Sequence, residues 1–451
     1  MAGRARSRLL LLVMALALPA VLAAAYLLLW QTGWLHRFDV GGVKINPRAR
    51  IRDDAVYELA VWEEEVPAPW ARESQRAVLE RAVQEFSELH ANARVTVELL
   101  DEAAARDRLA AALASGAPPD VYGAARTVLW GLPRQVPASP YLPPPARDEP
   151  PAYDGPALDA LTARGAVWGW PRGLWWDGWL ARKEAAAGGV WTYDQWRAAS
   201  GPAGRPPLSP ALDYTSLRLL EQLMGAAGFP SYADADGRLA WDREQLTRAA
   251  AWLRETYQAQ AAPGGPDAAA RRRLERLLSG DADVLAPVNP YAAQSAMRLA
   301  PGRFVVVPPP RPPEADPVWP VEASAYFVFH QTPYKGDDHT RLAAALAAFL
   351  AAKTEAWLVE AVGLLPVTVD GWQTWSRRAP WDEANRDALL QAARRAAAVP
   401  PWGAPASADA VREALLPLWR AFMAGETTPE DFADDVLETI ERVLDPEKAS
   451  R

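Results

Sequence analysis

The stretch LASGAPPDV, residues Leu113–Val121, ends a helix and begins a strand within a few residues. Gly116 stops the helix, because glycine readily adopts the left-handed backbone conformation found just after helix C-termini. Pro118 and Pro119 cannot continue the helix, and DVYGA from Asp120 is typical of a buried strand. The stretch therefore predicts a sharp helix-to-strand corner.

The segments before this corner alternate between strand and helix patterns. YELAVW from Tyr57 predicts a short strand, and apolar residues at helical spacing predict an amphipathic helix over about 70–90. RVTVELL alternates as a strand should, and Asp101 can cap the helix that follows it. A β-α-β-α-β order builds a parallel sheet with right-handed crossovers. The corner therefore delivers a strand whose C-terminal end faces the edge of the sheet where ligands bind.

The later part of the chain continues the α/β pattern. A proline-rich loop over 133–156 is followed by helices at about 215–226 and 242–260. GDADVLAPVNPY, RFVVVPPP and EASAYFVFH predict strands, and a helix is expected over about 340–361. In the helical C-terminal quarter, Thr428 and Pro429 are typical of an N-cap and a first helical position.

Composition sets limits on function. The chain has 451 residues, half of them hydrophobic, which is enough for more than one lobe. It has no cysteine, which excludes disulfides, thiol catalysis, cysteine-based zinc sites and lipid attachment through cysteine. The four histidines lack metal-ligand spacing, so no metal or cofactor site is expected. The net charge is −8, and the short Arg271–Arg273 run is typical of a solvated helix face, so no nucleic-acid partner is expected.

The N-terminus predicts a membrane segment. Arginines in residues 1–8 precede an apolar run over 9–30, which is long enough to cross a bilayer. The arginines favour a cytoplasmic N-terminus, which would make the chain a single-pass protein of the cell membrane with its bulk outside. A cleaved signal peptide is the alternative, since Ala23–Ala25 offers small residues. Residues 31–55 show no clear period and are interpreted as a juxtamembrane tether that extends at most about 80 Å.

The order of these pieces resembles the ABC-type extracellular solute-binding proteins of family 1, the carbohydrate-binding, maltodextrin-binding-like group. AVQEFSELHANARVTVELL and LAAALASGAPPDVYG follow the family's opening, and AVWGWPRG, VWTYDQW and LLSGDADVLAPVNPY resemble its crossing, a helix start and a later strand. LAAALAAFLAAKTEAWLVEAVGLLPV and FMAGETTPEDFADDVLETIERVL resemble its closing helices. The resemblance covers about residues 57–445.

The resemblance implies an α/β, two-lobe periplasmic-binding-protein-like (type II) fold with an interlobe cleft, preceded here by one N-terminal transmembrane helix. By analogy, residues 56–170 and 318–363 form the N-terminal lobe, and residues 171–310 and 364–451 form the C-terminal lobe. A sugar or oligosaccharide is expected to bind between the lobes and to be presented to the permease subunits of an ABC transporter, with no enzymatic activity.

Three features depart from the family pattern. The chain lacks the lipidated cysteine, so the membrane helix must replace it. WLARKEA has no asparagine where the family has an aromatic-Asn-Lys/Arg signature, and VWPVEASAY replaces a small, Gly-rich strand entry. Both of these changes lie near the expected cleft, so the ligand class does not transfer with the fold.

Carbohydrate recognition uses aromatic faces for C–H surface and planar polar groups for hydroxyls, and tryptophan reaches 21 residues in this chain. The candidates follow the predicted strands and crossings. They are Trp62, Glu63, Glu64, Arg126, Trp175, Trp176, Asp177, Tyr291, Trp319, Glu322 and Trp402.

Each candidate has a structural alternative. Glu63 and Glu64 can belong to a solvated acidic loop, Arg126 can be a surface arginine, and each tryptophan can be a core residue. Because adjacent strand residues point to opposite sides, at least one of Trp175 and Trp176 is expected to line the cleft.

Two other functions compete with transport. A degenerate relative could serve as a ligand sensor or an envelope scaffold. A glycoside hydrolase could use paired carboxylates such as Glu64 and Glu322, provided that they lie about 5–10 Å apart and that the pKa of one is raised.

Overall fold

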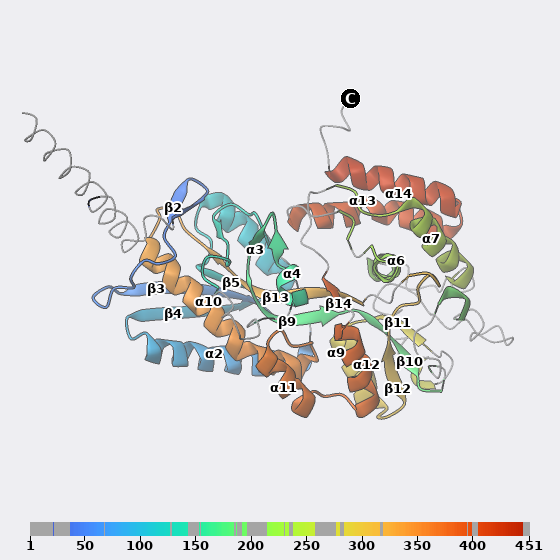
Figure 1. Ribbon diagram of the computed structural model, residues 1–451, viewed down its shortest axis with the longest axis horizontal. Coiled ribbons are helices and arrows are strands. Elements are labelled where there is room, and N and C mark those ends of the chain that lie inside the picture. Colours follow the sequence, from blue (N-terminus) through green and yellow to red (C-terminus); the bar gives the residue numbers. More distant parts are fainter. Residues whose placement is uncertain are drawn as a thin grey trace, which may run out of the picture.

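Two β-sheets, each flanked by helices, form two lobes along the long axis of the molecule (Figure 1). This computed structural model describes residue 21 and residues 37–444, except 67, 127–128, 143–152, 154, 185, 187–191, 196–213, 230, 234–237, 258–276, 280–283, 316–318, 395 and 399–404. The predicted membrane segment over 9–30, apart from Val21, and the candidate Trp402 therefore lie outside the described residues.

The N lobe is built on a sheet of seven described strands in the order β14-β13-β5-β3-β4, with β6 and β9 also paired to β13. The parallel strands β3, β4 and β5 are joined by α2 and α3, which confirms the predicted β-α-β-α-β run. The bounds are β3 Tyr57–Glu64, α2 Arg72–Leu89, β4 Ala93–Leu100, α3 Glu102–Ser115, β5 Val121–Ala124, β6 Gln135–Val136, β9 Trp170–Trp176, β13 Trp319–Phe329, α10 Asp337–Trp357 and β14 Ala396–Ala398.

The predicted corner after α3 is confirmed in detail. Gly116 has a φ of +84°, and the N–H of Ala117 donates to the carbonyl of Ala112 at 2.9 Å, which closes the helix. Asp120 then turns inward and is buried. Its carboxylate accepts from the backbone N–H of Ala60 at 2.9 Å and lies 2.8 Å from Nε2 of His339. The corner thus joins β3, β5 and α10.

The C lobe surrounds a three-stranded antiparallel sheet with β10 at its centre. Helices α6, α7, α13 and α14 lie on one side of this sheet, and α9 and α12 lie on the other (Figure 1). The predicted cap of the last helix is confirmed, since the N–H of Asp431 donates to Thr428 Oγ1 at 3.1 Å. The bounds are β10 Gly178–Arg182, α6 Tyr214–Ala226, α7 Arg243–Tyr257, β11 Val284–Val288, α9 Pro290–Leu299, β12 Phe304–Val307, α12 Glu383–Arg394, α13 Pro405–Ala424 and α14 Pro429–Leu444.

Short elements complete the described chain. They are β1 Phe38–Val40, β2 Val43–Ile45, η2 Pro69–Ala71, α4 Gly155–Asp159, β7 Thr162–Ala163, β8 Ala166–Val167, the π-helical turn η4 Leu358–Val362 and α11 Val369–Arg378.

The chain passes from the first sheet to the second at Asp177. β9 pairs with β13 in the N-lobe sheet from Trp170, opposite Tyr326, to Trp176, opposite Val321, with a register shift at Arg172. The first strand of the second sheet, β10, begins one residue after Asp177. The change of sheet therefore comes later in the chain than the boundary expected at 170/171.

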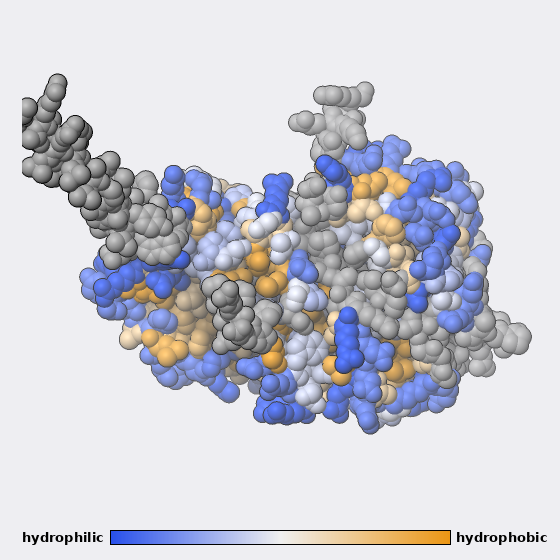
Figure 2. Space-filling view, viewed as in Figure 1, coloured by the Kyte–Doolittle hydropathy of each residue, from blue (hydrophilic) through white to orange (hydrophobic). Residues whose placement is uncertain are grey.

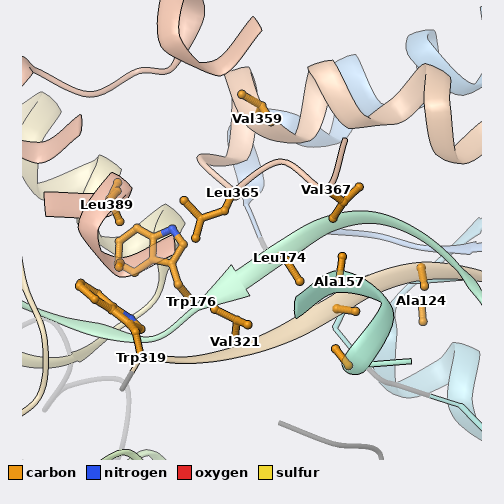
Figure 3. Packing of buried hydrophobic residues seen from close by; sticks show 14 of the residues in the cluster. Ala124, Ala157, Leu174, Trp176, Trp319, Val321, Val359, Leu365, Val367 and Leu389 are labelled. Atoms are coloured by element: carbon orange, nitrogen blue, oxygen red, sulfur yellow. The ribbon is translucent and has the colours of Figure 1, made fainter. Parts of the chain in front are cut away.

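One hydrophobic cluster continues across the junction of the two lobes (Figure 3). Trp176 on β9 lies against Trp319 at the start of β13, with ring centroids 6.2 Å apart. Leu365 pairs its backbone with that of Leu174, and its side chain points toward the Trp176 ring. The packing of Leu389 on the same cluster brings α12 of the C lobe into this core.

Residues 38–55 are not the free tether that the sequence predicted. β1 and β2 form a hairpin whose two-glycine turn, Gly41-Gly42, has positive φ at both positions. Val40 and Ile45 are buried in the N-lobe core with residues of α10. The lack of a clear period hid this hairpin, because each strand is only three residues long.

In the part of the chain that the structure describes, one helical stretch, Asp337–Val362, is long and apolar enough to cross a bilayer. It comprises α10 and η4, and 61% of its most apolar window is buried inside the protein. It is therefore the core helix of the N lobe.

The hydrophobic cluster at the junction of the lobes predicts that alanine substitutions at two leucines lower stability by very different amounts. Leu365→Ala should lower the free energy of unfolding by about 2–5 kcal/mol, because it removes a fully buried side chain and leaves a cavity. Leu299→Ala removes a side chain that is 63% exposed and should change stability by less than about 0.5 kcal/mol. Guanidinium denaturation of both variants checks this, and equal losses would contradict the assigned core.

Candidate functional site

Three of the predicted charged residues meet where β9 and β13 leave the N lobe. Arg126 follows β5, Asp177 lies between β9 and β10, and Glu322 is on β13. The Arg126 guanidinium forms an ion pair with each carboxylate, Nη2 with Asp177 and Nε with Glu322. Their side chains keep 18%, 13% and 20% of their exposure, so water still reaches the cluster. Burial lowers the pKa of Arg126, but the two carboxylates raise it by more. The net effect is a raised pKa, so the guanidinium keeps its charge.

Two of the predicted tryptophans hold the loops that carry these charges. The Trp175 indole donates to the carbonyl of Ala125, and the Arg126 guanidinium lies 5.7 Å from the Trp175 ring centroid. On the other side, Trp319 Nε1 donates to the carbonyl of Asp177 at 2.9 Å. Arg126 and Asp177 are therefore both fixed by an indole bound to the adjoining backbone.

The expectation that Trp175 or Trp176 is exposed between the lobes is not met. They point to opposite sides of β9, as expected, but each side is packed. Trp176 lies in the junction core between Trp319 and Trp381, whose rings are 6.2 and 5.8 Å away. Trp175 is enclosed by a small cluster that includes Leu358. In this conformation both are core residues.

Glu63 and Glu64, predicted as ligand contacts with a solvated acidic loop as the alternative, do not form such a loop. Both end strand β3 and both are buried. Glu63 pairs with Arg172 on β9, with Oε1 2.5 Å from Nη1. Partners inside the protein thus replace the water that an exposed acidic loop would have used.

Arg172 was missed by the sequence reading, although a single charge inside GWPRGLWW signals a buried partner. It is fully buried and donates to Tyr326 Oη at 2.9 Å and to Ser324 Oγ at 2.9 Å, in addition to Glu63. Burial raises the pKa of Glu63 while Arg172 lowers it, and Glu63 in turn helps to raise the pKa of Arg172. This pair joins β3, β9 and β13.

Glu64 hydrogen-bonds to the backbone next to Arg126. Its carboxylate accepts from Tyr122 Oη at 2.6 Å and from the backbone N–H of Ala125 at 2.7 Å. Burial raises the pKa of Glu64 to about 7, against the effect of these hydrogen bonds.

Partly exposed aromatic rings lie near the same junction. The predicted Tyr291 is in the first turn of α9, which Asn289 caps by accepting from Ala292 N–H at 2.9 Å. Trp70 in η2 was not predicted. It is 38% exposed, with its ring centroid 6.4 Å from that of Tyr291, and its Nε1 donates to the carbonyl of Ala361 at 3.0 Å. Segments from both lobes therefore meet around these two rings.

The predicted Trp62 lies on β3. It is partly buried against the junction core, and the Arg108 guanidinium lies 4.1 Å from its ring centroid, so that face of the ring is occupied.

The arrangement offers hydrogen bonds and aromatic faces. Arg126, Asp177 and Glu322 supply planar donors and acceptors, and Trp70 and Tyr291 supply rings, which suits a polar ligand with some apolar surface. Among the residues that the structure describes, no group of three or more His, Asp or Glu side chains could hold a metal ion.

The comparisons with known proteins agree on one fold. Residues 70–357, well over half of the chain, match the model of the bacterial extracellular solute-binding protein family. No curated protein sequence matches the chain.

Solved structures with the same fold include sugar-binding proteins. The MalE protein of Xanthomonas citri has a TM-score of 0.65 at 16% identity, covering 87% of this chain and 98% of its own. The GacH receptor of Streptomyces glaucescens, solved with acarbose, has a TM-score of 0.62 at 16% identity, covering 87% and 99%. The cyclic α-maltosyl-1,6-maltose binding protein of Arthrobacter globiformis has a TM-score of 0.64 at 15% identity, covering 87% and 100%. At such identities the likeness shows that the two-lobe α/β fold is shared.

Glu64 predicts a pH-dependent stability. Its folded-state pKa of about 7 lies above the ordinary 4.5, so its favourable contribution is full below about pH 4.5 and is lost as pH rises through about 7. The stability of the wild type relative to Glu64→Gln should therefore fall by up to about 3 kcal/mol between pH 4 and 8.

Denaturant unfolding of both proteins at several pH values measures this difference. Glu80→Gln, at an exposed position of α2, is the matched control and should show no such trend. A constant difference between the wild type and Glu64→Gln would contradict the assigned pKa.

Proposed function

The chain belongs to the bacterial extracellular solute-binding proteins, and from this premise we propose that it captures a carbohydrate-like ligand between its two lobes. Membership makes it a solute-binding protein whose bulk is extracytoplasmic. The observation that carries the carbohydrate proposal is the cluster of Arg126, Asp177 and Glu322 at the junction of the lobes, beside partly exposed aromatic rings.

The chemistry of this cluster suits sugar hydroxyls. A hydroxyl both donates and accepts, so it can bind a guanidinium and a carboxylate together. In the unliganded protein, Arg126 and its two carboxylates satisfy each other, and a ligand would have to offer equivalent hydrogen bonds to take their place. Trp70 and Tyr291 would then cover the apolar C–H faces of the ring.

Presentation of the ligand would follow from closure of the lobes. A ligand that contacts both lobes favours the closed form through its differential affinity. The crossing at Asp177 and the segments near 308–310 and 363–366 are the proposed hinges between rigid bodies. We further propose that residues 9–30 anchor the chain in the cell membrane and that ABC permease subunits receive the ligand.

Binding is favoured over catalysis. The two carboxyls that a glycosidase would use are already engaged, Glu64 by Tyr122 and Ala125, and Glu322 by Arg126. The sensor or scaffold alternative retains the same fold. It would be supported by a sensor-kinase gene beside this one, and transport by neighbouring permease genes.

The direct test is titration of the purified full chain with oligosaccharides. The panel takes maltose, maltodextrins, acarbose, cyclic α-glucans and xylo-oligosaccharides, with calorimetry and the melting temperature as readouts. Saturable binding that raises the melting temperature, with no product by chromatography, is expected. If no sugar in the panel binds, the carbohydrate proposal is contradicted. Product formation would favour the hydrolase.

A single substitution then tests the site. Glu322→Gln should weaken binding about tenfold or more, because a charged acceptor toward the ligand and Arg126 is lost. Glu98→Gln, which removes an exposed glutamate paired with Arg108, is the matched control and should leave affinity unchanged. Unchanged affinity in Glu322→Gln would remove the cluster from the site.

A further inference from the structure

Residues 38–55, here called the collar, lie at the end of the N lobe farthest from the C lobe (Figure 1). The hairpin buries Val40 and Ile45 in the same core as Leu342 and Leu346 of α10. Phe38 packs edge-on against Tyr141, with ring centroids 6.4 Å apart. The collar is therefore part of the folded lobe.

Side chains of the N lobe also hydrogen-bond to backbone carbonyls of the collar. His330 Nε2 lies 3.2 Å from the carbonyl of Val40, and Arg341 Nη1 donates to the carbonyl of Ala49 at 2.6 Å. Asn92 Nδ2 donates to the carbonyl of Arg52 at 2.7 Å. The three donors or ring atoms come from the residue after β13, from α10 and from the residue before β4, so the collar contacts several elements of the N lobe.

The connection from the collar to the predicted membrane segment is short. The apolar run ends at Trp30 and β1 begins at Phe38, so only residues 31–37 lie between them. Fully extended, such a segment spans at most about 25 Å. Arg37 is also held near the lobe, because its Nη2 lies 3.7 Å from a carboxylate oxygen of Asp337.

We propose that the collar docks the end of the N lobe on the headgroup surface of the bilayer that holds residues 9–30. This inference rests on the proposed membrane anchor. The occupant of the surface is the lipid bilayer, because the chain leaves the lobe here and has too little length to carry it away.

The outer face of the collar suits a position at the membrane surface and not within the hydrocarbon. Its exposed side chains include both signs of charge, Lys44, Arg48, Arg50 and Arg52 with Asp39, Asp53 and Asp54. Figure 2 shows hydrophilic side chains at the corresponding end of the molecule, next to hydrophobic surface. Since the two signs nearly balance, the short connection holds the lobe more than electrostatic attraction to anionic lipid does.

This placement orients the binding region. Strand β3 begins near the collar, where the N–H of Arg52 donates to Tyr57 Oη, and ends at Glu64, which accepts from the N–H of Ala125 beside Arg126. The cluster is therefore set back from the bilayer by about one strand length, roughly 25 Å. The C lobe then lies farther from the membrane anchor, and it is the lobe that moves when the two lobes close.

The absence of native cysteine allows a clean test, because one introduced cysteine is the only labelling site. The full chain is reconstituted into phosphatidylcholine–phosphatidylglycerol vesicles that contain a headgroup-labelled acceptor lipid. Energy transfer is measured from a donor at Lys44→Cys on the collar and from a donor at Glu438→Cys on an exposed position of α14. Transfer from the collar should be several-fold more efficient.

A length variant isolates the role of the connection. A twenty-residue Gly-Ser insertion after Gln31, between the apolar run and β1 in the sequence, should lower transfer from Lys44→Cys toward the value at Glu438→Cys. Equal transfer from the two sites, or no effect of the insertion, would overturn the docking inference. Failure of the chain to float with vesicles, or a mass showing that residues 9–30 are removed, would overturn both this inference and the proposed anchor. Oligosaccharide binding by the same protein reports separately on the ligand proposal.

Discussion

The rest of the structure depends on one constraint, the antiparallel pairing of β9 with β13. The Arg172–Glu63 ion pair joins β9 to β3 and so fixes this pairing in the sheet. Burying two charges is costly unless their hydrogen bonds are satisfied. Arg172 donates to Ser324 Oγ and Tyr326 Oη on β13, and both acceptors lie within reach of the guanidinium only in this strand register. A one-residue slip would move these side chains to the opposite face and leave the cation without them.

The same register builds the candidate site. It places Glu322 opposite Trp175, and Trp175 holds the loop that carries Arg126. It also places Trp319 where its indole can fix the backbone of Asp177, at the point where the chain enters the second sheet. A core of buried tryptophans thus lies on one side of the strands, and a partly exposed charge cluster lies on the other. Preorganised polar groups of this kind lower the entropic cost of binding a polar ligand.

Much of the fold could be predicted from the sequence, because strand and helix periods, glycine stops and proline starts are local signals. The corner at Gly116 and the cap at Thr428 are examples, and both are confirmed. Arg126, Asp177 and Glu322 were separate candidates near the crossings that the family resemblance implies, and the structure brings the three together. The burial of Trp175, Trp176 and Glu63 could not be predicted, because it depends on partners far away in the chain, such as Trp381 and Arg172. The collar was missed because its hairpin strands are too short to show a period.

The central claim is that ligand binds where β9 and β13 carry the charged cluster between the lobes. Amide hydrogen exchange of the full chain, with and without the oligosaccharide that binds most tightly, tests this most directly. Protection is expected to concentrate in residues 121–126, 174–180, 290–292 and 319–324, from both lobes together. Saturating ligand that protects only one lobe, or that leaves these segments unchanged, would contradict it.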